Sequence, residues 1–203
     1  MTKIKLCGLT RPCDIEAVNA LRPEFIGFVF APKSRRYVSP EAAADLRELL
    51  HPGIRAVGVF VNACLEEVNE LLKAGTIDMA QLHGNEDEAY IDRLRALTDK
   101  PIIKAFRVDT VQDVLAAARS PADLVLLDSG SGGTGTAFDW SLLRDIDRPY
   151  FLAGGLGVDN VGDAVRMLAP YAVDVSSGIE TGGYKDKTKM AAFVAAVRKE
   201  EKP

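Results

Sequence analysis

Residues 56–61 have the sequence AVGVFV, and residues 124–127 have the sequence LVLL. Neither run alternates apolar with polar residues, so neither is typical of a strand with one face in water. Strands that are apolar on both faces occur in parallel sheets with helices packed on each side. These two runs therefore predict an α/β fold with a parallel sheet.

Similar short runs recur along the chain roughly every 22 to 30 residues, the length of one strand, one helix and two loops. The segments between them, such as SPEAAADLRELL at 39–50, have apolar residues at the spacings of three and four that amphipathic helices show. The predicted strands are 3–6, 25–30, 55–61, 78–81, 101–106, 124–128, 150–153 and 172–176. Eight such units predict a single (β/α)8 TIM barrel of eight parallel strands over residues 1–203. A doubly wound open sheet is the alternative that the pattern leaves open.

Two segments depart from this regular pattern. The sixth helix, expected around FDWSLLRDI at 138–146, is short and poorly periodic. The last six residues, RKEEKP at 198–203, look frayed. We expect the fold to be least regular in these two places.

The composition excludes several classes of protein. With 47% hydrophobic residues and a net charge of −4, the chain can form one core but lacks the basic surface that binding to nucleic acid requires. The N-terminus has no signal-peptide core, and no apolar run approaches the roughly 18 residues that span a bilayer. The cysteines, Cys7, Cys13 and Cys64, include no CxxC pair that would indicate a zinc cluster or a disulfide framework. We expect a cytoplasmic protein with reduced thiols that binds neither nucleic acid nor membrane.

In a (β/α)8 barrel the functional residues lie at the C-terminal ends of the strands. Asp128 directly follows the apolar run 124–127, and a partly desolvated carboxyl group there could deliver a proton near neutral pH. Alternatively, Asp128 could only accept hydrogen bonds from the loop behind it. That loop, GSGGTG at 130–135, matches the GxGxxG pattern of dinucleotide sites, but no acidic residue suited to a ribose follows the next strand. A glycine-hinged lid or a loop of backbone N–H donors is the better interpretation.

Two glycine-rich loops follow the last two predicted strands. LAGGLGVDNV at 152–161 and VDVSSGIETGG at 173–183 have small residues where a backbone must approach a ligand closely. In barrels this pair of loops commonly binds a phosphate through backbone N–H groups and a helix N-terminus. Either loop alone could be an ordinary tight turn. The pair predicts a phosphoester substrate.

Three further places carry candidate residues. Lys33, Arg35 and Arg36 precede a proline-capped helix, where a guanidinium could hold a carboxylate or simply be solvated. His83 has no second His or Cys at metal spacing, so packing and hydrogen bonding are the simpler role for it. Cys7, in KLCGLT, lies between a predicted strand and a predicted helix. It could be a partly ionised base or nucleophile, or a buried structural thiol.

The chain resembles the phosphoribosylanthranilate isomerase family of tryptophan biosynthesis in stretches that span nearly its whole length in order. These are KLCGLT, GFVFAPKSRRYVSPE, VGVFVN, QLHGNE, KAFRV, LLDSGSGGTGTAFDW, LAGGL and VDVSSGIETGGYKD. The resemblance implies an Amadori rearrangement of N-(5-phosphoribosyl)anthranilate to 1-(2-carboxyphenylamino)-1-deoxyribulose 5-phosphate. It implies no metal and no organic cofactor. We expect a monomer or a homodimer that acts on this small phosphosugar substrate.

The same resemblance implies a role for each site residue. Asp128 would protonate the furanose ring oxygen, and Cys7 would remove the C2 proton. Arg36 would hold the anthranilate carboxylate, although Arg35, which replaces a frequent proline, leaves open which arginine does so. The phosphate would be bound at Gly154, Gly155, Ser177 and Gly178, with Asp174 orienting that loop.

Two other classes of function remain open. A phosphosugar lyase would use Lys5 or Lys104 as a Schiff-base nucleophile. A non-catalytic phosphosugar-binding barrel would keep Cys7 and Asp128 as structural residues. A related barrel isomerase accepts both tryptophan and histidine intermediates and uses a pair of aspartates. Because Cys7 stands at the first of these positions, we predict specificity for the anthranilate substrate.

Overall fold

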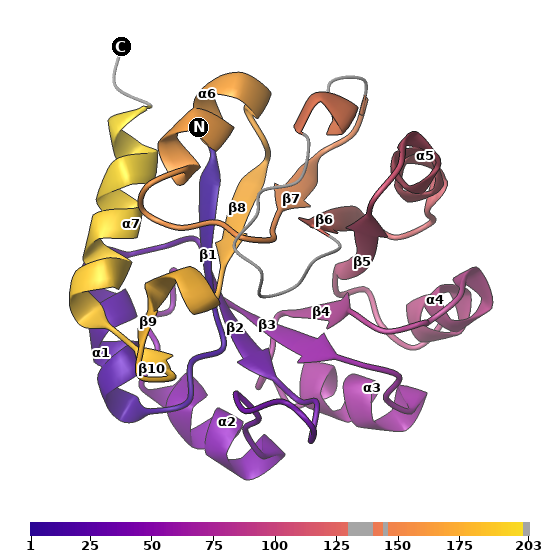
Figure 1. The fold of residues 1–203 in the computed structure, drawn as a ribbon. Helices are drawn as coiled ribbons and strands as arrows, with labels where there is room; N and C mark the ends of the chain where they lie inside the picture. The colour runs from indigo at the N-terminus through magenta and orange to yellow at the C-terminus, as the bar shows by residue number, and fades with distance from the viewer. Residues whose placement is uncertain (130–139, 144–145, 201–203) are drawn as a thin grey trace.

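In the computed structural model, which describes residues 1–129, 140–143 and 146–200, eight parallel strands close into a barrel (Figure 1). The strands are β1 (Lys3–Cys7), β2 (Phe25–Val29), β3 (Arg55–Phe60), β4 (Met79–Leu82), β5 (Ile102–Val108), β6 (Leu124–Ser129), β7 (Tyr150–Leu152) and β8 (Ala172–Val175). Each strand pairs with the next in chain order, and β1 pairs with β8. The barrel prediction is confirmed. The open-sheet alternative is wrong, because an open sheet would leave β1 and β8 unpaired.

The described residues form seven α-helices. Figure 1 shows the helices around the barrel. They are α1 (Pro12–Leu21), α2 (Pro40–Glu48), α3 (Leu65–Lys73), α4 (Glu88–Arg95), α5 (Val111–Arg119), α6 (Val161–Leu168) and α7 (Lys187–Lys199). The predicted start of α2 is confirmed: the Ser39 hydroxyl accepts a hydrogen bond from the Ala42 N–H at 3.2 Å, which caps the helix.

The two irregular segments have different outcomes. Where the sixth helix was expected, the described residues form only a short 3-10 helix, η1 (Trp140–Leu143). The frayed end was predicted too early, because Arg198 and Lys199 belong to α7. The Arg198 guanidinium donates to the carbonyl of Arg22 at 2.6 Å, and Glu200 pairs with Arg166 at 2.8 Å. These contacts hold the end of α7 against the end of α1 and against α6.

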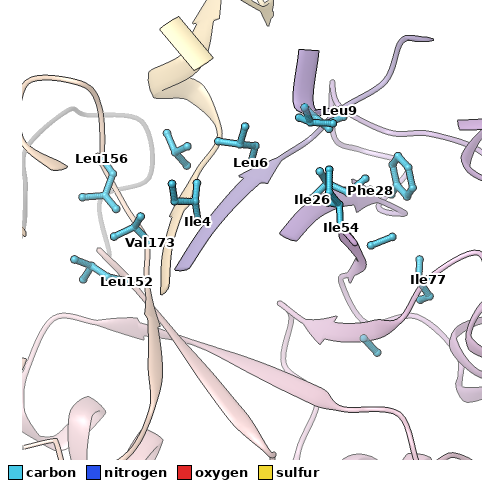
Figure 2. Packing of buried hydrophobic residues seen from close by; sticks show 14 of the residues in the cluster. Ile4, Leu6, Leu9, Ile26, Phe28, Ile54, Ile77, Leu152, Leu156 and Val173 are labelled. Carbon is cyan, nitrogen blue, oxygen red and sulfur yellow. The ribbon is translucent and has the colours of Figure 1, made fainter. Parts of the chain in front are cut away.

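The apolar core has two parts that follow the alternation of side chains along each strand. Outward side chains pack between the strands and the helices, and Figure 2 shows Ile4 and Leu6 of β1 near Val173 of β8 in this part. Inside the barrel, Phe25, Phe151 and Tyr171 gather at the N-terminal ends of the strands, with the Phe151 ring 5.3 Å and 5.7 Å from the other two. The N-terminal end is therefore filled with aromatic rings.

A short hairpin follows β8 and was not predicted. After the 3-10 helix η2 (Ser177–Ile179), β9 (Glu180–Thr181) pairs antiparallel with β10 (Tyr184–Lys185). Gly182 and Gly183 form the turn with φ of 59° and 86°. Positive φ at both central residues is typical of the type I′ turn that favours Gly-Gly. In Figure 1 the hairpin lies beside α1, over the same end of the barrel as the β1–α1 loop.

Candidate active site

A cavity of about 500 Å³ lies at the C-terminal ends of the strands. Its wall contains seven of the eight residues predicted for the site: Cys7, Arg36, Asp128, Gly154, Gly155, Asp174 and Ser177. The eighth, Gly178, packs against the backbone of Leu156, where an added Cβ would lie 2.1 Å from the carbonyl oxygen. The fold thus brings residues from five strands and their loops to one cavity.

Strand geometry explains which side chains reach the cavity. Because successive residues of a strand point to opposite faces, residues two apart share the barrel interior. On β1 these are Lys5 and Cys7, while the flanking Ile4 and Leu6 point outward. The same alternation along β4 brings Gln81, and then His83 directly after the strand, to the cavity wall.

Cys7 ends β1 with only 8% of its surface exposed. Gly27 on β2 leaves room for the thiol, since a Cβ there would lie 2.6 Å from Sγ. Burial raises the pKa of the Cys7 thiol, and the ammonium groups of Lys5 and Lys185 oppose this only in part. The dipole of α1 does not lower this pKa, because α1 begins only at Pro12 and the effect is confined to the first turn. In the free protein Cys7 is therefore a thiol near neutral pH.

Lys5 is fully buried and lies in a polar network that crosses the barrel. Its Nζ donates to Asp174 Oδ2 at 3.0 Å and to Gln81 Oε1 at 2.8 Å. Burial alone would lower the pKa of Lys5, but the charges of Asp174 and Cys7 and the hydrogen bonds to them together outweigh it, and the pKa is raised. Gln81 Nε2 lies 2.8 Å from His83 Nδ1, and His83 Nε2 lies 3.4 Å from Asp128 Oδ2. Sequence reasoning identified His83 and Asp128 separately but missed their contact, and it missed Gln81, which connects His83 to Lys5.

The two lysines considered for a Schiff-base mechanism are both engaged. Lys5 holds the buried ion pair with Asp174. Lys104 Nζ donates to the Gly84 carbonyl at 2.6 Å and pairs with Glu86 at 3.0 Å, with its side chain 8% exposed. Within the described ranges, neither lysine lines the cavity. A nucleophilic lysine must reach the substrate as a neutral amine, so this arrangement disfavours the lyase alternative.

Arg36 lies at the edge of the cavity and is bound to Glu180, a residue that sequence reasoning missed. Arg36 Nε and Nη2 donate to the two carboxylate oxygens at 2.6 and 3.0 Å, while Arg35 and Lys185 add contacts of 2.6 and 2.7 Å. Burial alone would raise the pKa of Glu180, but the hydrogen bonds from Arg36 and Lys185 outweigh it and lower the pKa to about 2. Gly8 leaves space for Arg36, since a Cβ there would lie 2.5 Å from its Cδ. Three cations around one carboxylate leave this corner of the cavity positively charged.

The two predicted phosphate loops lie next to each other above β7 and β8. Gly154 and Gly155 have φ of 86° and 62°, a conformation that glycine adopts readily. Ser177 and Gly178 begin η2, where the first backbone N–H groups lack partners within the helix. Asp174 lies below these loops: Oδ2 pairs with Lys5, and the buried Oδ1 has no hydrogen-bond partner among the described residues.

Several sequence-based predictions concern other parts of the molecule. The glycine-rich loop at 130–135 lies outside the described residues. Cys7, Cys13 and Cys64 are free thiols. In the described part of the chain, no group of His, Cys, Asp and Glu side chains is suited to hold a metal ion. No helix within those ranges is long and apolar enough to cross a membrane.

Comparison with protein families gives a match over nearly the whole chain. Residues 4–196 match the family described as N-(5′-phosphoribosyl)anthranilate isomerase. Among curated proteins, the enzyme of that name from Endomicrobium trichonymphae is 46% identical over 98% of this chain and 99% of its own length. The one from Dechloromonas aromatica is 47% identical over 98% and 97%.

Solved structures agree with this match. The phosphoribosyl anthranilate isomerase of Thermotoga maritima has a TM-score of 0.90 and 34% identity, covering 98% of this chain and all of that one. A similar structure, with a TM-score of 0.88 and 34% identity over the same shares, holds reduced 1-(o-carboxyphenylamino)-1-deoxyribulose 5-phosphate. The 3-hexulose-6-phosphate synthase of Salmonella typhimurium, at 16% identity and a TM-score of 0.77, shares the fold alone.

Proposed function

Because the chain belongs to the N-(5′-phosphoribosyl)anthranilate isomerase family, we propose that its cavity performs the family's reaction by general acid–base catalysis, with Asp128 as the acid and Cys7 as the base. The reaction is an Amadori rearrangement in tryptophan biosynthesis. It converts an aldosylamine, N-(5-phosphoribosyl)anthranilate, into the aminoketose 1-(2-carboxyphenylamino)-1-deoxyribulose 5-phosphate. The observation that supports these roles is that a carboxyl group from β6 and a thiol from β1 line the same cavity.

The first step opens the sugar ring. Asp128 gives its proton to the furanose ring oxygen, the bond from that oxygen to C1 breaks, and the oxygen leaves as a hydroxyl group. The nitrogen lone pair forms a C1=N bond, so the product of this step is a Schiff-base cation. A positioned general acid of this kind contributes about a hundred- to ten-thousandfold to the rate.

The second step moves a proton from carbon. The thiolate form of Cys7 takes the proton from C2, the C2–H electrons form a C1=C2 bond, and the C=N electrons return to nitrogen. This gives an enolamine, which becomes the ketone when C1 gains a proton and the C2 hydroxyl loses one. The ammonium groups of Lys5 and Lys185 favour the thiolate that this step requires.

The anthranilate carboxylate is held at the positively charged corner of the cavity. Arg36 uses Nε and Nη2 to bind Glu180, which leaves Nη1 and the outer N–H of Nη2 for a second carboxylate. Arg36 is the better candidate than Arg35 because its side chain is only 22% exposed, against 60% for Arg35. A partly buried, oriented guanidinium loses less conformational freedom on binding.

The substrate phosphate is held by backbone groups of Gly154, Gly155, Ser177 and Gly178. A residue larger than glycine does not fit at position 178, because its Cβ would collide with the Leu156 carbonyl of the neighbouring loop. Asp174 acts from beneath these loops through its ion pair with Lys5 and makes no direct contact with the phosphate, because two anions would repel each other.

The remaining predictions concern specificity and organisation. Cys7 at the end of β1, where a dual-specificity barrel would carry an aspartate, supports turnover of the anthranilate substrate only. Comparable turnover of the histidine-pathway aldosylamine would contradict this. Action in the cytoplasm, without nucleic acid and as a monomer or homodimer, stays a prediction.

The residue roles can be tested by following the fluorescence of phosphoribosylanthranilate as the purified protein consumes it. We expect Cys7→Ser and Asp128→Asn each to lower kcat at least a hundredfold, because each removes one proton-transfer step. Cys13→Ser and Cys64→Ser are matched controls that should retain normal turnover. Circular dichroism would establish that the variants are folded. Near-normal turnover by both catalytic-site variants would show that the acid and base are assigned wrongly.

A further inference from the structure

Gln81 has only one possible amide orientation in the buried network. It is 1% exposed, and its Oε1 lies 2.8 Å from Lys5 Nζ. An ammonium group can only donate hydrogen bonds, so the atom facing Lys5 must be the oxygen. The Nε2 amide group of Gln81 consequently points at His83 Nδ1, 2.8 Å away, and can only donate to it.

This orientation determines the protonation of His83. Its Nδ1 must accept a hydrogen bond and therefore carries no proton. Both the imidazolium and the neutral form with a proton on Nδ1 would set two N–H groups against each other at 2.8 Å. The remaining form is neutral imidazole with its proton on Nε2, the nitrogen that lies 3.4 Å from Asp128 Oδ2.

We propose that His83 is a positioning residue for the general acid: Lys5 and Gln81 hold it as the Nε2–H tautomer, and this N–H orients Asp128 and stabilises its carboxylate as ring opening proceeds. The inference deepens the proposed function, since it rests on Asp128 as the acid. It also gives a task to the buried Gln81 and a second task to Lys5, which already favours the Cys7 thiolate.

The direction of the His83 N–H determines which oxygen of Asp128 carries the acid proton. A carboxyl oxygen that accepts from His83 is not the one that carries the acid proton, so Oδ2 faces His83 and Oδ1 carries the proton. When Oδ1 gives its proton to the ring oxygen, negative charge develops on Asp128. The contact of 3.4 Å, longer than an ordinary hydrogen bond, then shortens, as contacts at catalytic sites commonly do along the reaction. His83 keeps its own proton throughout.

Nitrogen NMR of the histidine side chains tests the tautomer directly. The chain has only two histidines, so the His51→Gln variant assigns the spectrum of His83. His51 suits this purpose because its Nδ1 accepts from the Gly53 N–H, away from the cavity. At neutral pH we expect the chemical shift of an unprotonated Nδ1 and a protonated Nε2 in His83. An Nδ1–H form or a doubly protonated ring would overturn the proposal.

A substitution of Gln81 tests what sets the tautomer. In Gln81→Glu a carboxylate oxygen replaces the amide N–H opposite Nδ1, and it should draw a proton to Nδ1. We therefore expect the shifts of His83 to lose the unprotonated Nδ1 pattern. An unchanged spectrum in folded protein would show that Gln81 does not control His83.

Kinetics of two His83 variants test the effect on the acid. Glutamine can extend an amide N–H to the place of Nε2–H, whereas alanine cannot. We expect His83→Ala to lower kcat about ten- to hundredfold, the value of one hydrogen bond to a charged group, with KM little changed. His83→Gln should recover most of the loss. Equal kcat values for the two variants, or a change in KM alone, would contradict the positioning role.

The outcomes separate this inference from the proposed function. If Asp128 is not the acid, Asp128→Asn will be active while His83 still shows the Nε2–H tautomer. If the network is wrong, Asp128→Asn will be inactive while His83 shows another protonation state. The NMR result does not depend on activity, so a variant with no measurable turnover still gives an answer.

Discussion

Cys7 shows how one side chain is suited to two opposite requirements. As the proposed base it must become a thiolate, yet burial raises the pKa of its thiol and keeps it protonated in the free protein. Lys5 and Lys185 pull in the other direction, so the thiolate is disfavoured at rest but not excluded from the reaction. A buried cysteine that is mostly thiol is also protected from alkylation and oxidation, because the thiolate is the reactive form.

The raised pKa of Cys7 gives a pH prediction. In the proposed mechanism the active enzyme needs a thiolate on Cys7 and one proton on Asp128, so activity disappears when the pair loses its last proton. Because the pKa of Cys7 is raised, the pair loses this proton only at a higher pH. We expect kcat/KM to stay level through neutral pH and to decline only above about pH 8.5, the ordinary pKa of cysteine.

Two measurements check this. A pH profile of kcat/KM reports the free enzyme, and the rate of Cys7 alkylation by iodoacetamide in a Cys13→Ser, Cys64→Ser background reports the thiolate directly. The alkylation rate should still be rising at pH 9. An alkaline decline of kcat/KM below pH 7.5, or alkylation that has already reached its maximum at pH 7, would contradict a raised pKa.

At the scale of elements, the β9–β10 hairpin connects the positively charged corner of the cavity to the end of β1. Glu180 at its start orients Arg36, and Lys185 at its end donates to the Ser176 carbonyl at 2.9 Å and pairs with Glu180. Ser176 in turn donates to the Cys7 carbonyl at 3.1 Å. The hairpin with its Gly-Gly turn thus contacts both the positively charged corner of the cavity and the end of β1.

This arrangement predicts the effect of Glu180→Gln. The change keeps the size of the side chain but removes the charge that holds Arg36, so Arg36 becomes less ordered. We expect KM for phosphoribosylanthranilate to rise about tenfold, the cost of one charge-assisted hydrogen bond, with a smaller effect on kcat. Steady-state kinetics would measure both parameters.

The control for this change is Glu16→Gln, which removes an exposed carboxylate that lies 3.5 Å from Lys187 and should alter neither parameter. Glu180→Asp, which keeps the charge, should be less affected than Glu180→Gln. If KM is unchanged while kcat falls, the hairpin acts on the chemical step and not on binding of the carboxylate.

Elements were predictable from the sequence to the extent that their signals are local. No strand boundary differs from the prediction by more than two residues, because apolar runs and helix caps are read over a few positions. The hairpin had a local signal as well, in the Gly-Gly turn, but its strands are too short for a periodic pattern. Contacts such as Arg36 with Glu180, which are 144 residues apart, depend on how the barrel closes and could not be predicted from spacing.

At the scale of the whole molecule, the two ends of the barrel have different tasks. The C-terminal ends of the strands carry the ionisable groups of the cavity, and the N-terminal ends are filled by Phe25, Phe151 and Tyr171. In this fold the loops at the C-terminal ends of the strands can vary in sequence while the core of the barrel stays intact. Stability and activity should therefore respond to different substitutions.

The change Phe151→Ala tests this division. It removes a fully buried ring at the N-terminal end and should lower the free energy of unfolding by roughly 3–5 kcal/mol. KM and kcat should stay within about twofold at temperatures where the variant is folded. Urea denaturation monitored by circular dichroism measures the stability, and Met167→Ala, at a side chain that is 62% exposed, is the control. A loss of activity larger than the loss of folded protein would show that the two ends are coupled.

The ion pair between Lys5 and Asp174 also affects when the barrel can form during synthesis of the chain. The two residues lie on the first and last strands of the barrel, 169 positions apart. A ribosome that adds about 5 to 20 residues per second needs roughly 10 to 30 s to make the chain between them. During that interval the nascent chain contains an ammonium group that no carboxylate from β8 can yet neutralise, and burying it alone would be costly. We therefore expect β1 to stay solvated until β8 has been synthesised.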